Sequence, residues 1–174
     1  MKNVMIFLLM IVGILGGCQD ITVGYLLTED ANFDPDSLVI KRYEALDIDP
    51  GEPNPDYDWY IEMGWDPNGG DGDPIPPRLN PGEDYYRFIS NAPWISAPVQ
   101  GIEGTLPIFC SLKTIKPAGE NAEKLRKYLK VYGDGTFEIS LKHDIPVGRY
   151  LISLNFSNEG YSKDLDDCFT IIVK

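Results

Sequence analysis

The sequence predicts a mainly β protein, a β-sandwich that carries one short helix and long acidic loops. Several short runs of β-branched and aromatic residues are separated by turn-forming residues, as is usual for sandwiches. The run 145–156 alternates apolar and polar residues, which is the period of a half-buried strand, whereas only 122–130 has a helical pattern. Because 43% of the residues are apolar and 11% are aromatic, the chain can build a core.

In the first half of the chain, short strands are predicted between long loops. The predicted strands are β-branched or aromatic runs, and the loops are rich in proline, glycine and aspartate. The strands are predicted at 21–27, 38–43, 58–65 and 85–90, and the loops at 47–58 and 66–84.

In the second half, the strand pattern is more regular. A strand is predicted over 105–115, with Ile108, Cys110 and Leu112 on one face, and the short helix follows at 122–130. Residues 130–140 predict a hairpin, with Asp134-Gly135 in a type I′ turn. The last two strands are predicted at 145–156, with Tyr150, Ile152, Leu154 and Phe156 facing inward, and at 166–174.

The N-terminus has the pattern of an export signal. Its apolar run, 4–15, is shorter than the about 20 residues that a membrane-spanning helix needs. The next residues, Leu15-Gly16-Gly17-Cys18, resemble the lipobox of bacterial lipoproteins. This resemblance implies cleavage before Cys18, acylation of its thiol and attachment to a membrane outside the cytoplasm. The alternative is a buried N-terminal helix with an incidental cysteine.

Composition excludes some functions. The net charge is −12, and residues 29–84 hold 16 acidic but only three basic residues, so nucleic acid is not an expected partner. The single histidine, His143, excludes a histidine-rich metal site, and no serine-centred elbow or Cys–His pair stands out. A pair of catalytic carboxylates stays open among the many acids. We expect a protein without enzymatic activity.

Aromatic residues gather beside acidic ones in the first half of the chain. Sugar rings pack their C–H faces on aromatic planes, and carboxylates accept hydrogen bonds from hydroxyl groups. This pattern predicts a ligand-binding surface, with a glycan as the candidate ligand; the alternative is that the rings pack inside the protein. The predicted binding residues are Tyr57, Trp59, Tyr60 and Trp65.

The loop after these residues is a candidate calcium site. It offers closely spaced oxygen ligands on a glycine-rich backbone, which suits a hard cation. The EF-hand pattern is not met, because Gly70 occupies the fifth position and Pro77 the twelfth. The alternative is a solvated acidic loop. The candidate ligands are Asp66, Asn68, Asp71 and Asp73.

Two cysteines remain besides Cys18. Cys110 and Cys168 both lie in predicted strands, and in an oxidising compartment they could form a disulfide. Closing that loop would stabilise the fold by about 4 kcal/mol in the chain-entropy model. The alternative is two free, buried thiols.

The end of the chain resembles the last two strands of bacterial immunoglobulin-like or cadherin-like domains. The resemblance lies in Pro146-Val147-Gly148-Arg149-Tyr150, the alternating strand, Asn158-Glu159-Gly160-Tyr161 and Phe169-Thr170-Ile171-Ile172-Val173. It implies an immunoglobulin-like β-sandwich. Three segments, GYLLTEDANFDPDSLVIKR, APWISAPVQGIEGT and VGRYLISLNFSNEGYS, also resemble outer-membrane surface lipoproteins of gut anaerobes, which are often encoded near glycan-uptake systems of the starch-utilisation type.

These interpretations divide the chain into four parts. They are a lipoprotein signal peptide (1–17), a lipidated tether (18–23), an acidic, loop-rich β region (24–97) and an immunoglobulin-like sandwich region (98–174). The expected function is an accessory cell-surface binding module, anchored in the membrane by lipid, with a glycan or an outer-membrane protein as partner. The alternative is a structural or assembly protein: an adhesin, a fimbrial component or a docking subunit of an outer-membrane complex.

Overall fold

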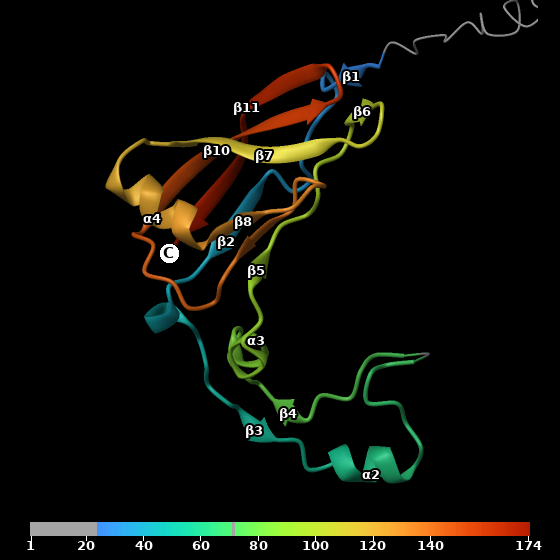
Figure 1. The fold of residues 1–174 in the computed structure, drawn as a ribbon. Coiled ribbons are helices and arrows are strands. Elements are labelled where there is room, and N and C mark those ends of the chain that lie inside the picture. Colours follow the sequence, from blue (N-terminus) through green and yellow to red (C-terminus); the bar gives the residue numbers. More distant parts are fainter. Residues whose placement is uncertain (1–23, 71) are drawn as a thin grey trace, which may run out of the picture.

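Two β-sheets pack face to face in the computed structural model, which describes residues 24–70 and 72–174 (Figure 1). The larger sheet contains, in order, β2 (Ser37–Ile40), β11 (Tyr161–Val173), β10 (Gly148–Asn158) and β7 (Phe109–Lys116). The smaller sheet contains β5 (Trp94–Ile95), β9 (Phe137–Ile139) and β8 (Leu129–Val131). β2 pairs with β11 in parallel, and the other neighbouring strands are antiparallel.

The core lies between these sheets. Alternation along β10 buries Tyr150, Ile152, Leu154 and Phe156, as predicted. Phe137 of the smaller sheet and Phe169 of the larger one meet with ring centroids 4.8 Å apart, and Phe33 packs against both rings. Because both sheets contribute to one apolar cluster, the predicted mainly β sandwich is confirmed.

Two hydroxyl groups on β10 of the larger sheet form hydrogen bonds within the protein. The register of β10 shifts around Ser153, whose buried hydroxyl oxygen accepts a 2.9 Å hydrogen bond from the Asp167 amide. At the start of the strand, the Tyr150 hydroxyl donates a 2.8 Å hydrogen bond to the Pro146 carbonyl. A contact of this kind, known as the tyrosine corner, is also found in immunoglobulin-type sandwiches.

The described residues contain three α-helices where the sequence predicted one. The predicted helix is α4 (Glu120–Tyr128), displaced by two residues from its expected position. The predicted strands at 58–65 and 85–90 are wrong, because these segments form α2 (Tyr57–Glu62) and α3 (Tyr85–Ser90). Left-handed residues end both helices: Gly64, with φ +82°, follows α2, and Asn91, with φ +48°, follows α3. A 3₁₀ turn, η1 (Tyr43–Ala45), follows β2.

The predicted hairpin between β8 and β9 is present, but its turn differs. A type I′ turn needs positive φ at both central residues, and here only Gly135 has it, with φ +80°. The Gly135 amide donates to the Tyr132 carbonyl, and the Tyr132 amide donates to the Thr136 carbonyl. These bonds define a three-residue loop in which the glycine occupies the left-handed position.

Residues 46–93, which follow η1 and precede β5 in the chain, project from the sandwich, and we call them the arm (Figure 1). The arm contains α2, α3 and a small ladder of β3 (Glu52–Pro53) with β4 (Arg78–Leu79). Among its described apolar residues only Ile75 is buried. At its base, the Asp84 amide donates a 3.0 Å hydrogen bond to the Asp47 carbonyl, so the outgoing and returning chains meet there.

The arm and the sandwich do not divide the chain at residue 97. β2 and β5 belong to the predicted acidic region, yet they pair with β11 and β9 of the sandwich. A further ladder of β1 (Leu26–Leu27) with β6 (Glu103–Gly104) also joins the two predicted regions. The acidic region therefore contributes strands to the sandwich and forms the arm as a long insertion.

The predicted signal peptide, the lipobox and Cys18 lie outside the described residues. Within 24–70 and 72–174, no helix has both the length and the apolar character needed to cross a bilayer.

Candidate functional site

The end of helix α2 brings two aromatic rings together. The Trp65 amide donates to the Tyr60 carbonyl and the Gly64 amide to the Ile61 carbonyl, both at 3.0 Å. With Gly64 in the left-handed region, these bonds form a Schellman motif, in which the residue after the glycine folds back over the last helical turn. The Tyr60 and Trp65 ring centroids lie 5.0 Å apart as a result.

Three of the four predicted binding aromatics form a continuous, open group. Trp59 packs edge-on against Tyr60, with ring centroids 5.1 Å apart, and Tyr60 packs against Trp65. Trp59 and Trp65 keep 55% and 57% of their surface exposed, so they are not core residues. Among the described residues, their indole N–H groups and the Tyr60 hydroxyl have no hydrogen-bond partner within the protein.

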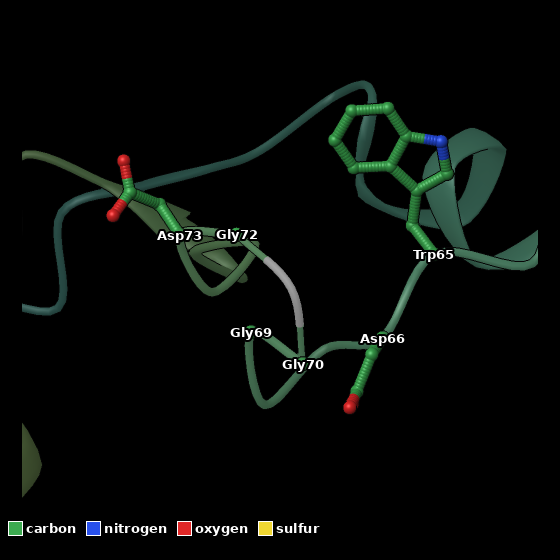
Figure 2. Close-up of a pocket in the computed structure, with 6 residues that line it drawn as sticks. All are labelled: Trp65, Asp66, Gly69, Gly70, Gly72 and Asp73. Atoms are coloured by element: carbon green, nitrogen blue, oxygen red, sulfur yellow. The ribbon is translucent and has the colours of Figure 1, made fainter.

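Trp65 borders two adjoining hollows. The first, which we call the arm pocket, has a volume of about 380 Å³ and includes Tyr60, Trp65, Asp56 and Asp73 in its walls. The second has about 330 Å³ and lies between Trp65 and the loop that follows it (Figure 2). Asp73 lines both hollows. An aromatic plane and carboxylates therefore border the same space.

The opposite wall of the arm pocket comes from the returning chain. Pro74, Ile75, Pro76 and Leu79 line it together with Asn54. Asn54 belongs to the chain that leads into α2 and links it to the returning chain. Its side-chain amide donates a 2.7 Å hydrogen bond to the Pro76 carbonyl, and its backbone amide donates one to the Pro77 carbonyl. Of these lining residues, Ile75 is buried. These residues lie within the predicted loops 47–58 and 66–84, but none of them was among the predicted binding residues.

The surroundings of the arm pocket are acidic. Among the described residues that line it, Asp56 and Asp73 are charged and none is cationic. The two arginines of the arm are occupied elsewhere: Arg78 donates to the Gly51 carbonyl, and Arg87 donates to the Pro93 carbonyl and covers the buried Trp94 ring at 4.2 Å. Neither arginine lines the arm pocket.

The fourth predicted binding residue, Tyr57, lies in the first turn of α2 and is half-buried. It lines neither hollow, and unlike Trp59 it does not pack against the ring of Tyr60 or Trp65. The aromatic group of the candidate site therefore consists of Trp59, Tyr60 and Trp65.

The calcium ligands are only partly brought together. Asp71 lies outside the described residues, and within 24–70 and 72–174 no group of three or more His, Cys, Asp or Glu side chains could hold a metal. One carboxylate oxygen of Asp66 accepts a 2.8 Å hydrogen bond from the Asn68 amide of its own loop. Figure 2 shows the Asp66 and Asp73 side chains directed away from each other. Calcium binding by this loop stays a prediction.

Cys110 and Cys168 are free thiols in the structure, so the predicted disulfide is absent. Cys110 lies on β7 and Cys168 on β11, which flank β10 on opposite sides. Strands on opposite sides of β10 are two strand spacings, or about 10 Å, apart. A disulfide needs Cα atoms within about 7 Å of each other. Burial raises the pKa of Cys110 to about 12 and that of Cys168 to about 11, so both remain unreactive thiols at neutral pH.

The single histidine lies apart from the arm pocket. His143 is buried in the sandwich, with its ring 6.2 Å from that of Tyr128. Burial lowers the pKa of His143 and favours its neutral form.

Comparisons with known proteins add little to this picture. No protein-family model matches the sequence, and no curated protein matches it. A solved structure with some similarity is a SusE-like, surface-located polysaccharide-binding protein from the heparin utilisation locus of Bacteroides thetaiotaomicron. The TM-score is 0.37 at 18% identity, and the match covers 48% of this chain and 12% of that one. At this similarity, neither a ligand nor a fold assignment transfers to this chain.

Proposed function

We propose that this protein is a lipid-anchored, extracytoplasmic binding module that holds a glycan chain in the arm pocket and has no enzymatic activity. The lipobox ending in Cys18 supports the anchor. One observation carries the binding role: the exposed indole of Trp65 forms a wall shared by two hollows that Asp73 also lines.

The chemistry of the pocket suits a sugar. The Trp65 ring offers a flat apolar surface to the C–H face of a pyranose, while the Asp56 and Asp73 carboxylates can accept hydrogen bonds from its hydroxyl groups. The Tyr60 hydroxyl and the Trp65 N–H can donate to ring or glycosidic oxygens. The rings are held by packing and by the Schellman motif, so little conformational entropy is lost when a ligand stacks on them.

Charge restricts the ligand to an uncharged glycan. Asp56 and Asp73 line the pocket without a cation among its described lining residues, and Glu62, Asp58 and Asp66 lie close by in the sequence. A uronic acid or sulfate group would meet several negative charges at short range, which is unfavourable at low ionic strength. The proposed ligand is therefore a neutral polysaccharide.

A protein-docking role is the second candidate function. It is favoured by the exposed apolar side chains of Ile61 and Met63, which lie on or just after helix α2 beside the aromatic group. Exposed aromatic and methionine side chains are also enriched at protein interfaces.

Affinity electrophoresis in gels that contain neutral polysaccharides tests the glycan proposal. Native protein is expected to be retarded by at least one of them, and Trp65→Ala is expected to weaken binding by about 2- to 10-fold, because a stacking contact contributes about 0.5–1.5 kcal/mol. Trp59→Ala is expected to have a smaller effect, since Trp59 does not line the pocket. A carboxymethylated derivative of the same polysaccharide is expected to retard the protein less.

Ile89→Ala is the matched control, because Ile89 is an exposed apolar residue on α3 that does not line the pocket. It should leave retardation unchanged. Absence of retardation across a broad panel, or equal loss in the Ile89→Ala and Trp65→Ala proteins, would contradict glycan binding at this pocket and favour the docking role.

A further inference from the structure

We propose that the end of the sandwich opposite the arm lies against the surface of a phospholipid bilayer. This inference rests on the lipid anchoring that forms part of the proposed function. The surface concerned, which we call the basal end, comprises the β1–β6 ladder, the segment that leads into β7, and the turn between β10 and β11.

The basal end exposes large apolar side chains. Leu106, three residues before β7, is 80% exposed, and Phe109, the first residue of β7, is 60% exposed. Exposed single hydrophobic residues are ordinary, but a group of them at one end of a molecule indicates an interaction surface. The other members of the group are Tyr25, Leu27 and Tyr161.

Hydrogen bonds hold these residues at one place although they are far apart in the sequence. The Asn158 side-chain amide donates to the carbonyls of Tyr25 (2.7 Å) and Thr105 (3.0 Å), and so ties the β10–β11 turn to the segments before β1 and after β6. Tyr161 pairs with Asn158 in the ladder, and Phe109 lies opposite its neighbour Ser157. The apolar side chains therefore extend from a single, well-connected base.

The position of the N-terminal chain identifies the occupant. The described chain begins at residue 24, next to Tyr25 in this base, and Cys18 is six residues earlier. Six residues span at most about 20 Å when fully extended. A lipid on Cys18 therefore keeps residue 24, and with it the basal end, within about 20 Å of the bilayer.

The composition of the basal end suits a membrane surface rather than insertion. Tyrosine is enriched at the level of the lipid headgroups, and leucine and phenylalanine reach the acyl boundary from there. The charged residues Glu103 and Glu159 are exposed in the same segments, so the group can dip into the interface but cannot enter the hydrocarbon. With this end on the membrane, the arm projects away from it (Figure 1), and the arm pocket faces the medium.

Quenching by brominated phospholipids tests this orientation. The full-length lipidated protein, reconstituted in phosphatidylcholine–phosphatidylglycerol vesicles, would carry Phe109→Trp. Bromine quenches indole emission only at short range, and interfacial residues lie about 5–10 Å into the headgroup–acyl boundary. We expect brominated vesicles to remove a substantial part of the emission that the new indole adds. Native protein should be unaffected, because Trp59 and Trp65 lie on the arm and Trp94 is buried.

Val147→Trp is the matched control. Val147 is also apolar and 64% exposed, but it precedes β10, whereas Phe109 lies beside the far end of that strand. Eleven strand residues, about 35 Å, separate the two ends. The emission of the indole in the Val147→Trp protein should therefore not be quenched. Both variants change exposed residues, and retained thermal unfolding would verify that they fold.

The outcomes separate the two proposals. Flotation with the vesicles and quenching at Phe109→Trp alone would support the orientation. Flotation with no quenching, or with equal quenching of the Val147→Trp protein, would overturn the basal contact while leaving the anchor intact. The Cys18→Ala control is expected not to float with the vesicles. If the protein that keeps Cys18 also fails to float, both the anchor and the inference are overturned.

Discussion

Phe137→Ala is expected to destabilise the protein by about 3–5 kcal/mol, because truncation of a fully buried aromatic ring removes its apolar surface and leaves a cavity. The Phe137 ring has no exposed surface and contacts Phe33 and Phe169 between the two sheets. For a chain of this size, the loss corresponds to a decrease in Tm of roughly 10–15 °C. Thermal and denaturant unfolding followed by circular dichroism would measure it.

Phe109→Ala provides the comparison of the same residue type at an exposed position. Because Phe109 keeps 60% of its surface in solvent, its truncation is expected to change stability by about 0.5 kcal/mol or less. Similar effects of the two substitutions would mean that Phe137 does not lie at the centre of a shared core.

Asp84→Asn is expected to loosen the arm at its base. The Asp84 side chain is 4% exposed. Its carboxylate lies 2.7 Å from Lys41 Nζ and accepts a 3.0 Å hydrogen bond from the Asp47 amide. Hydrogen bonds to charged groups contribute about 1.5–3 kcal/mol. We therefore expect the Gly82 amide, which donates to Asp49 in the same base, to lose about 10- to 100-fold in hydrogen-exchange protection.

The pH dependence of this contact has a defined sign. Burial alone would raise the pKa of Asp84, but the hydrogen bonds from Lys41 and the Asp47 amide outweigh it and hold the pKa below its usual value. A carboxyl group whose pKa is lower in the folded state stabilises that state through its ionised form. This stabilisation is fully present above the pKa of the unfolded chain, about 3.9, and is lost as the pH falls through the lower pKa of the folded state. The difference between native and Asp84→Asn proteins should therefore disappear in acid.

Glu83→Gln is the control for the Asp84 prediction. Glu83 also contacts Lys41, at 3.1 Å, but its side chain is mostly in solvent, so its charge should contribute less than about 1 kcal/mol. If Glu83→Gln lowers the protection of Gly82 as much as Asp84→Asn does, then general surface charge, and not the buried pair, holds the arm.

The sandwich strands were largely predictable because their signal is local. Alternation over 145–156 reports directly which residues of β10 face the core, and the Asp134-Gly135 pair marks the hairpin even though its turn type differs. The short helices were missed because aromatic residues dominate both and favour strands by propensity. In α2, the deciding residue is Gly64, which ends a helix only when the preceding turn is already helical.

The candidate site was predictable by residue type but not by shape. The sequence pointed to Trp59, Tyr60 and Trp65 because sugar-binding sites combine aromatic rings with carboxylates. The opposite wall depends on the pairing of β3 with β4 and on the contact of Asn54 with Pro76, which local patterns do not encode. The same reason accounts for the domain boundary: β2 pairs with β11 across most of the length of the chain.

Excision of the arm tests the central claim most directly. Because Asp47 and Asp84 are hydrogen-bonded at its base, residues 48–83 can be replaced by a short Asn-Gly turn without disturbing either sheet. The measurement is a calorimetric titration of native and excised proteins with a neutral oligosaccharide from the polysaccharide that retards the native protein. We expect saturable binding by the native protein, none by the excised protein, and unfolding temperatures that differ by only a few degrees. Equal binding by an excised protein that unfolds cooperatively would contradict the assignment of the glycan site to the arm.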